Sequence, residues 1–402
     1  MNYVHGLEQN ICYTTFMFYK LITFGCQMNI SDSERIVTVL KKMKYKPTSN
    51  KSKVNLIIIN TCSVRQKATD RIFGQVKNWR KLKKEKPSLI IILTGCITKQ
   101  DKEKFEKNVD LIFDIKNLPE LPKKIIEIQQ RQQCLNIQPP SISNNDYFYI
   151  KPQYSTKNIA YVPIMTGCNN FCSYCIVPYT RGREISRSSE EILKEAKNLI
   201  KKGYKEICLL GQNVNSYKFL IFNFPSNSAD RQFSNKSKIN VITFPTLLQI
   251  LNDLPGDFQI SFFTSHPKDM SDELINVITK CKKIKKELHL PVQSGDNKIL
   301  KKMNRCYTTA NYTKLVQKIR KKIRQIFLST DIIVGFPGET KKQFENTVKL
   351  CKKIKFNKAF ISQYSPRPET MSAKLKDNVS KEEKKRRWEI LDKMINHYID
   401  TN

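Results

Sequence analysis

The sequence contains neither an apolar run long enough to cross a membrane nor a secretory signal. Its longest apolar runs are LIII at 56–59 and LIIIL at 89–93, whereas a membrane-spanning helix needs about 20 residues. The opening MNYVHGLEQN lacks a basic region, and no A-x-A cleavage site follows an apolar stretch. We therefore expect a cytoplasmic protein, in which structural disulfides are rare.

Acidic residues are also scarce. The 402 residues include 36 Asp and Glu against 71 Lys and Arg, which gives a formal charge of +35. Such a surplus favours a polyanionic partner, and nucleic acid is the first candidate. Lysine-rich chains also arise from AT-rich coding sequence, and their lysines are then simply solvated. Charge alone leaves both interpretations open.

The length and the pattern of the chain predict two domains, because 402 residues are too many for one ordinary core. The first part alternates short β-rich runs with polar helical segments, which predicts a doubly wound parallel sheet. A stretch rich in Pro, Ser, Asn and Gln indicates a linker. Six further strand–helix units predict a partial (β/α)6 barrel with its site at the strand ends. The predicted extension, first domain, linker, barrel and C-terminal helix are 1–16, 17–135, 136–157, 158–378 and 379–402.

Three of the twelve cysteines follow predicted strands. Cys26, Cys62 and Cys96 end the segments LITFGC, LIIINTC and IIILTGC. The carboxyl ends of parallel strands lie along one edge of a sheet, where ligands bind. Three unrelated buried cysteines are the alternative, but they would have no reason to repeat one topological position. We predict that the fold gathers the three thiols into a metal or redox site.

A second set of three cysteines is local. Cys168, Cys172 and Cys175 lie in TGCNNFCSYC, after the first predicted barrel strand. Structural zinc sites and electron-carrying iron–sulfur clusters use four protein ligands. Three thiolates leave one iron of a 4Fe–4S cluster open to a small molecule with an amine and a carboxylate, such as S-adenosylmethionine. An incomplete zinc knuckle or a chance cluster is the alternative.

This loop resembles that of the radical S-adenosylmethionine enzymes, including the aromatic Tyr174 before the last cysteine. The resemblance extends over residues 17–390 to the methylthiotransferases, and within them to the enzymes that methylthiolate tRNA adenosine. It rests on TFGCQMNISDSE, NTCSVR, GCNNFCSYCIVPYTRGREISR, LLGQNVNSY, FTSHPKD, HLPVQSG, TDIIVGFPGET and YSPRPET.

The resemblance implies the chemistry. Cys168, Cys172 and Cys175 would hold a radical-generating 4Fe–4S cluster, and the three strand-end cysteines would hold an auxiliary one. A methylthio group would be placed on C2 of N6-isopentenyladenosine at position 37 of tRNA, next to the anticodon. One S-adenosylmethionine would methylate a sulfur at the auxiliary cluster. A second would yield the radical that removes hydrogen from C2. Further partners would be an electron donor, such as flavodoxin or ferredoxin, and a sulfur source.

Other strand-end residues are candidates for binding the cofactor. Gly211, Gln212 and Asn213 end the second predicted barrel strand, and Gln293 and Asp331 lie at later strand ends. In the enzymes that the chain resembles, such positions contact S-adenosylmethionine. Polar capping of strand ends is the alternative.

Arg181, Arg183 and Arg187 follow the cysteine loop and are candidates for contact with tRNA phosphates or the target base. Solvated loop arginines are the alternative.

Members of the family that the chain resembles carry a small β-barrel RNA-binding domain after a helix that matches residues near 385–400. We expect this domain to be absent here. Two rival functions remain within the methylthiotransferases: action on threonylcarbamoyladenosine in tRNA, or on a ribosomal-protein aspartate. A non-catalytic iron–sulfur or RNA-binding protein is the alternative of another class.

Overall fold

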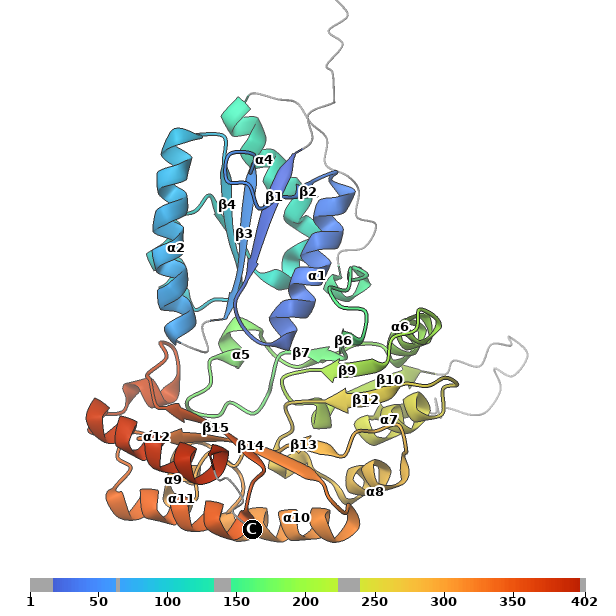
Figure 1. The fold of residues 1–402 in the computed structure, drawn as a ribbon, viewed down its shortest axis with the longest axis vertical. Helices are drawn as coiled ribbons and strands as arrows, with labels where there is room; N and C mark the ends of the chain where they lie inside the picture. The colour runs from blue at the N-terminus through green and yellow to red at the C-terminus, as the bar shows by residue number, and fades with distance from the viewer. Residues whose placement is uncertain (1–16, 63–65, 134–145, 223–238, 398–402) are drawn as a thin grey trace, which may run out of the picture.

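The computed structural model of the protein describes residues 17–62, 66–133, 146–222 and 239–397. The predicted extension 1–16, the last two residues of the predicted first domain (134–135) and residues 136–145 of the predicted linker lie outside them. The described chain forms an N-terminal α/β domain above a larger α/β domain (Figure 1).

The N-terminal domain is built on a parallel sheet of order β2-β1-β3-β4-β5. Its strands are β1 (Phe18–Thr23), β2 (Lys46–Pro47), β3 (Leu56–Cys62), β4 (Ile90–Cys96) and β5 (Leu111–Ile112). All neighbouring pairs are parallel.

Helices cover both faces of this sheet (Figure 1). They are α1 (Gln27–Lys42), α2 (Gln66–Glu85), α3 (Lys99–Glu106), η1 (Ile115–Glu120) and α4 (Leu121–Gln133). One apolar core lies under α1 and α4, and another lies under α2 and α3. Because both faces are covered, β3 and β4 are buried along their whole length, as expected for near-continuous apolar runs. The predicted doubly wound domain is confirmed.

The second part of the predicted linker belongs to this domain. Tyr147, Phe148 and Ile150, in and after η2 (Tyr147–Tyr149), are buried in the core under α1 and α4. Their apolar side chains are isolated in a polar stretch, and only the fold shows that they reach a core.

The second domain contains six parallel strands. They form two sheets, of order β12-β9-β6 and β13-β14-β15, and a parallel bridge between Ile260 and Ile284 connects the two. The strands are β6 (Ile159–Pro163), β9 (Glu206–Leu210), β12 (Gln259–Phe262), β13 (Glu287–His289), β14 (Phe327–Val334) and β15 (Lys358–Gln363). The predicted partial barrel is confirmed.

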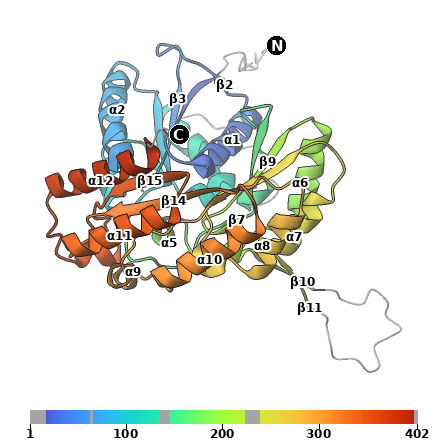
Figure 2. The ribbon, with the colours of Figure 1, turned by 60° about the horizontal axis from the view of Figure 1, so that its bottom comes forward.

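Helices surround the outside of the barrel (Figure 2). They are α6 (Ser189–Lys201), α7 (Phe244–Asn252), α8 (Asp272–Lys280), α9 (Asn297–Lys302), α10 (Thr309–Lys322), α11 (Lys341–Ile354) and α12 (Lys381–Asn396). Shorter elements lie near the strand ends: β7 (Met165–Thr166), α5 (Val177–Thr180), β8 (Ile185–Ser186), η3 (Val214–Ser216), η4 (Pro267–Asp269) and η5 (Met371–Lys374).

A hairpin follows η3. Its described ends, β10 (Lys218–Phe222) and β11 (Ile239–Thr243), pair antiparallel and project from the barrel (Figure 2). Phe219 and Ile242 pack against the barrel core, whereas Leu220 and Val241 are exposed. The runs KFLIF and INVIT favour strands because they are rich in β-branched and aromatic residues.

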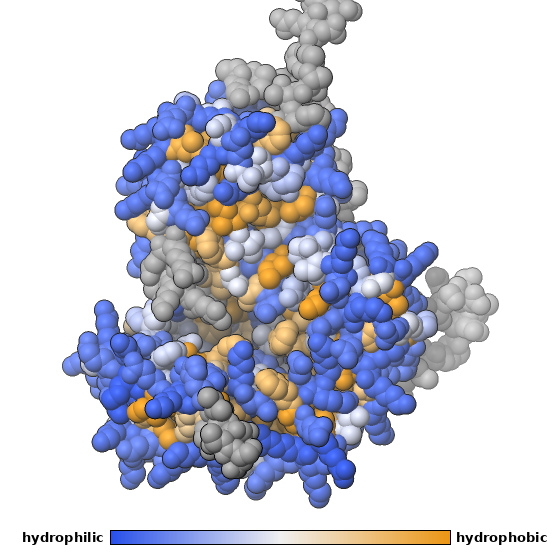
Figure 3. Space-filling model, in the orientation of Figure 1, coloured by the Kyte–Doolittle hydropathy of each residue, from blue (hydrophilic) through white to orange (hydrophobic). Residues whose placement is uncertain are grey.

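The two domains share a packed boundary along α1. Met28 is buried against Cys208 and Leu210 of β9, and the Ser31 hydroxyl donates to the Tyr161 carbonyl at 3.2 Å. Apolar side chains gather on the N-terminal domain and near its junction with the barrel (Figure 3). The sheet edge that carries the first cysteines is therefore held against the barrel. Across the described residues, every helix is too short or too polar to span a bilayer.

Candidate active site

The strand register places two of the first three cysteines side by side. Cys62 and Cys96 are partners at the ends of β3 and β4, and Cys26 follows β1 at the start of α1. Gly95, before Cys96, has a φ of +109°, and a Cβ there would lie 2.1 Å from the Thr61 carbonyl oxygen. Only glycine allows this close approach of the two strand ends.

Two asparagines fix the turn that carries Cys26. The Asn29 side chain donates to Asn60 Oδ1 at 3.1 Å and to the Thr61 carbonyl at 3.0 Å. Its oxygen accepts from the Cys26 backbone at 3.3 Å. The Asn60 amide returns a bond to the Asn29 carbonyl at 2.8 Å. These buried bonds connect the ends of β1 and β3, and sequence reasoning assigned neither asparagine a role.

Arg181 extends from the barrel to this site. Its Nε donates to Cys96 Sγ at 2.9 Å, and its terminal nitrogen pairs with Asp32 at 2.6 Å. The two charged side chains are 4% and 0% exposed. Tyr147 donates its hydroxyl to the same carboxylate. A hydrogen bond with Cys62, together with the Arg181 charge, lowers the pKa of Cys96 to about 6 despite burial, which favours the metal-binding thiolate.

The second set of cysteines lies on a loop between β7 and α5. Cys168 donates its backbone N–H to the Gly182 carbonyl at 3.2 Å, and Ser173 donates its own to the Met303 carbonyl at 3.0 Å. Burial, with smaller contributions from the other two thiols of the set, raises the pKa of Cys175 to about 12. An apolar environment of this kind disfavours a free thiolate, and a bound cation would stabilise it.

Arg305 donates a hydrogen bond to a thiol of this second set, as Arg181 does to a thiol of the first set. It donates to Cys172 Sγ at 3.5 Å, to the Pro291 carbonyl at 2.7 Å and to the Tyr307 hydroxyl at 2.9 Å. Burial opposes its charge, and the neighbouring Tyr174, Tyr307 and Cys172 raise its pKa overall. The guanidinium is thus a permanent positive charge beside the loop.

Among the described residues, no group of three His, Cys, Asp or Glu side chains could hold a single metal ion. A structural zinc site brings each ligand within ~2.3 Å of one ion. The thiolates of a cubane instead bind different irons, so they stand farther apart. Each site offers three thiols beside one guanidinium donor, and thiolates are the ligands that iron–sulfur clusters use.

Unpaired polar atoms lie at the strand ends of the barrel. Buried side-chain atoms without a hydrogen-bond partner include Gln212 Oε1, Asn213 Oδ1, both polar atoms of Asn215, Ser265 Oγ and Gln293 Oε1. Each such atom costs about 1–3 kcal/mol, so a group of them at one end of a barrel indicates a polar ligand. The donor and acceptor atoms of S-adenosylmethionine fit this environment.

The residues predicted to bind the cofactor lie at this end of the barrel. A Cβ on Gly211 would lie 2.5 Å from Met165 Cγ. Asn213 also donates to Asp269 at 2.7 Å. Gln293 adopts a φ of +68°, and its N–H donates to the Asp331 carbonyl at 2.9 Å. The Asp331 carboxylate lies 3.2 Å from His289 Nε2. Their role in cofactor binding stays a prediction.

The three candidate arginines lie in different environments. Arg183 is exposed. Arg181 is committed to Asp32 and Cys96, as described above. Arg187 is 7% exposed and pairs with Glu195 and, at 3.6 Å, with Glu191. Burial and these ion pairs give Arg181 and Arg187 a positioning role. Contact with substrate stays a prediction, and of the three side chains Arg183 is the accessible one.

Comparison with known proteins decides the family. A model of the Radical SAM superfamily matches residues 162–351, and one of the Uncharacterized protein family UPF0004 matches residues 19–114. A tRNA-2-methylthio-N(6)-dimethylallyladenosine synthase of Carboxydothermus hydrogenoformans is 42% identical over 94% of this chain and 83% of its own length. The chain belongs to the methylthiotransferase family of radical S-adenosylmethionine enzymes. A synthase of the same name from Clostridium botulinum is 44% identical over 93% of this chain and 80% of its own.

Solved structures show the same fold as this methylthiotransferase at low identity. The radical S-adenosylmethionine methyltransferase TsrM from Kitasatospora setae superposes with a TM-score of 0.58 at 12% identity, over 89% of this chain and 75% of its own. The cobalamin-dependent S-adenosylmethionine radical enzyme OxsB gives 0.55 at 12% identity, over 95% of this chain and 55% of its own. The predicted enzyme class, a radical S-adenosylmethionine transferase, is confirmed by the family.

Proposed function

We propose that this methylthiotransferase modifies tRNA at C2 of N6-isopentenyladenosine, at position 37 next to the anticodon. The observation that carries the proposal is the bond from Arg181 to Cys96. Arg181 lies six residues after Cys175, and its guanidinium contacts a thiol of the other set. This bond links the segment after the cysteine loop to the strand-end cysteines and so supports the proposal, and the relatives' names supply the substrate.

Each set of thiols would hold one 4Fe–4S cluster, and two molecules of S-adenosylmethionine would be used per reaction. When bound, these groups supply one-electron cleavage of S-adenosylmethionine and the sulfur that is transferred. The chain would position them, with Cys26 exposed and Cys172 and Cys175 half-buried. Cys62 and Cys96 are buried, and the unpaired amide atoms of Gln212, Asn213 and Gln293 would orient the amino acid part of S-adenosylmethionine.

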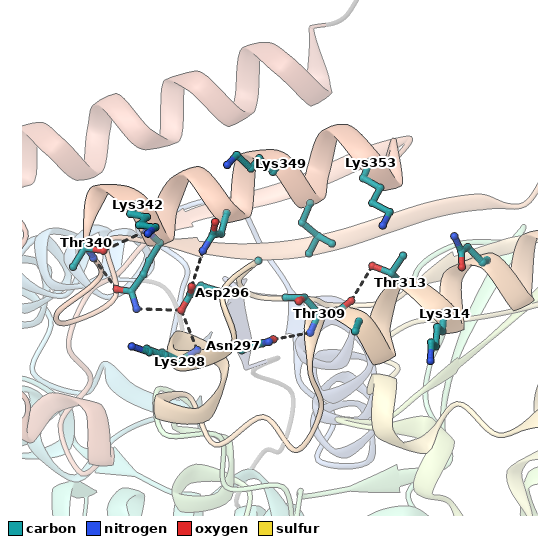
Figure 4. Close-up of a pocket in the computed structure, with 16 residues that line it drawn as sticks. Asp296, Asn297, Lys298, Thr309, Thr313, Lys314, Thr340, Lys342, Lys349 and Lys353 are labelled. Carbon is teal, nitrogen blue, oxygen red and sulfur yellow. Dashed lines mark hydrogen bonds between the residues drawn. The ribbon is translucent and has the colours of Figure 1, made fainter.

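The surface of the barrel carries a groove that suits a phosphate backbone. A cavity of about 980 Å³ lies between α10 and α11 and contains Lys298, Lys314, Lys342, Lys349 and Lys353 in its lining. Lys349 and Lys353 come from α11 and Lys314 from α10 (Figure 4). Among the described residues none of the five has an ion-pair partner. We call these residues the lysine groove and propose that it binds tRNA phosphates.

The proposed methylthiolation at position 37 of tRNA also requires electrons and sulfur. An electron donor such as flavodoxin or ferredoxin, and a sulfur source, would serve the two clusters. A tRNA substrate would place the protein in the cytoplasm.

The test is expression in a strain that lacks its own enzyme, followed by mass spectrometry of tRNA nucleosides. We expect 2-methylthio-N6-isopentenyladenosine with the native chain and none with Cys62→Ala or Cys172→Ala. A methylthio group on threonylcarbamoyladenosine, or on a ribosomal-protein aspartate, would support the rival substrates instead. Anaerobic reconstitution should give about eight irons per chain. Unchanged tRNA and ribosomal protein at full iron content would refute the proposal.

A further inference from the structure

A strained aromatic residue interrupts the loop of Cys168, Cys172 and Cys175. Phe171 has a φ of +46°, a conformation that a bulky side chain adopts only under constraint. Such strain costs about 1–3 kcal/mol and concentrates at functional sites.

Asn304 holds Phe171 in this conformation. Its side-chain amide donates to the Phe171 carbonyl at 3.0 Å and to the Asn170 carbonyl at 3.3 Å. Asn304 itself has a φ of +56°, which asparagine tolerates better than most residues. Asn304 thus ties down the backbone on both sides of the Asn170–Phe171 peptide bond.

The Phe171 ring belongs to a cluster of planar side chains at the surface. The Arg183 guanidinium lies over Phe171, with Cζ 4.4 Å from the ring centroid. Tyr179 meets Phe171 edge to face, with the centroids 6.2 Å apart. Tyr179 is 45% exposed and Arg183 is also exposed. Exposed aromatic and guanidinium planes of this kind are the surfaces on which unpaired nucleobases stack.

The cluster directly adjoins the second cysteine set. A Cβ on Gly167 would lie 2.0 Å from the Arg183 carbonyl oxygen, so the backbone of Arg183 is pressed against the residue before Cys168. Tyr179 lies in α5, which follows Cys175. A molecule stacked on this cluster would lie beside the reacting centre.

We propose that Phe171, Tyr179 and Arg183 form a stacking platform for the unpaired bases that flank the target adenosine in an RNA loop. This inference rests on the proposed function. The platform would bind bases by stacking, whereas the ammonium groups of the lysine groove would bind phosphates. The groove should control the salt dependence of RNA binding, and the platform should not.

The test measures RNA binding to the anaerobically reconstituted holoenzyme. The probe is an anticodon stem-loop RNA with N6-isopentenyladenosine at the target position and 2-aminopurine beside it. Fluorescence anisotropy at several salt concentrations gives the Kd and its salt slope, and 2-aminopurine emission reports stacking. The variants are Tyr179→Ala, Tyr179→Phe as the matched control that keeps the ring, Arg183→Lys, and Lys349→Glu in the lysine groove.

We expect Tyr179→Ala to weaken binding about five- to hundredfold, with the salt slope unchanged and the quenching of 2-aminopurine lost. Tyr179→Phe should bind like the native chain. Arg183→Lys should reduce quenching while keeping the charge, because it loses the planar guanidinium. Lys349→Glu should reduce the salt slope and leave quenching intact.

The platform is refuted if Tyr179→Ala binds like the native chain, or binds more weakly with quenching unchanged. If Tyr179→Ala loses iron, the Kd and the 2-aminopurine quenching of Arg183→Lys decide between the two outcomes. Failure of the platform is distinct from failure of the proposed function. In the first case the native chain still methylthiolates the RNA, and in the second it leaves the RNA unmodified.

Discussion

The two cysteine sets differ in how the chain assembles them. Cys168, Cys172 and Cys175 lie within eight residues on one loop. Cys26, Cys62 and Cys96 come from three strand ends, and the register of β3 and β4 pairs two of them. A local set depends on one turn being held in place, whereas a dispersed set depends on a whole sheet.

The arginines of the two sets differ in charge compensation. Arg181 contacts Cys96 and is paired with the buried Asp32. Arg305 contacts Cys172, and it also donates to the Pro291 carbonyl and the Tyr307 hydroxyl. The strand-end set therefore has a nearly neutral ion pair beside it, whereas Arg305, beside the loop set, has no carboxylate partner among the residues that the structure describes. Four predictions can break or sharpen this contrast.

The largest effect is expected at the compensated pair. Arg181→Met should lower the free energy of unfolding by about 3–5 kcal/mol, because it leaves the Asp32 carboxylate buried without its counter-charge. The double variant Arg181→Met/Asp32→Asn should recover most of the loss. Urea unfolding of the metal-free chain measures both, and a double variant no more stable than the single one would contradict the ion-pair explanation.

The loop set should be sensitive to one turn. Gly167→Ala should lower stability by about 2–3 kcal/mol and reduce iron to about four per chain, because a Cβ there would lie 2.0 Å from the Arg183 carbonyl. Gly182→Ala is the matched control, since Gly182 has the same φ of +80° but no atom within 4 Å of its Cβ position. Thermal unfolding and iron analysis should separate the two. Equal losses would mean that backbone strain alone, and not the clash, is responsible.

The free energy of unfolding should depend on pH through His266, which lies near Arg305. Burial, followed by the charges of Arg305 and Lys268, lowers the pKa of His266 to about 2. The unfolded chain takes up this proton near pH 6.5 and the folded chain does not, so stability falls as pH drops below 6.5. Between pH 7 and 5 His266 should contribute a loss of roughly 1–2 kcal/mol.

His266→Asn should remove this contribution and keep the bond that His266 accepts from the Lys268 N–H. Urea unfolding of the metal-free variant at pH 7 and pH 5 is the measurement. A pH dependence equal to that of the native chain would show that His266 titrates normally in the folded state.

The smallest effect concerns the redox potentials. Positive charge and N–H donors near cluster thiolates raise the reduction potential. Arg305→Met should lower the midpoint potential of the loop cluster by on the order of 50 mV. The background is a chain with Cys26, Cys62 and Cys96 changed to Ala, so that one cluster is observed by electron paramagnetic resonance. A reciprocal experiment with Asp32→Asn should raise the potential of the strand-end cluster. If neither variant changes the midpoint potential of its cluster, the two arginines do not differ in their electrostatic effect on the clusters.

Much of the fold could be predicted because it follows local patterns. Apolar runs such as LIIIL at 89–93 lie within buried parallel strands, and their spacing by helical segments predicts the doubly wound sheet and the barrel. The hairpin of β10 and β11 and the buried Tyr147 were not predicted. The runs KFLIF and INVIT of the hairpin do favour strands, whereas the burial of Tyr147 depends on which core its segment reaches, and a single sequence window does not contain that information.

The sequence by itself determined which residues of this methylthiotransferase are soft ligands, and that six of them fall into two sets of three. Only the tertiary structure decided what surrounds those ligands. Asp32 and Arg181 are 149 positions apart, and Arg305 and Cys172 are 133 apart. Hydrogen bonds and ion pairs act over a few ångströms in space and not along the chain. Their partners are therefore set by how α1, the cysteine loop and the barrel strands pack together.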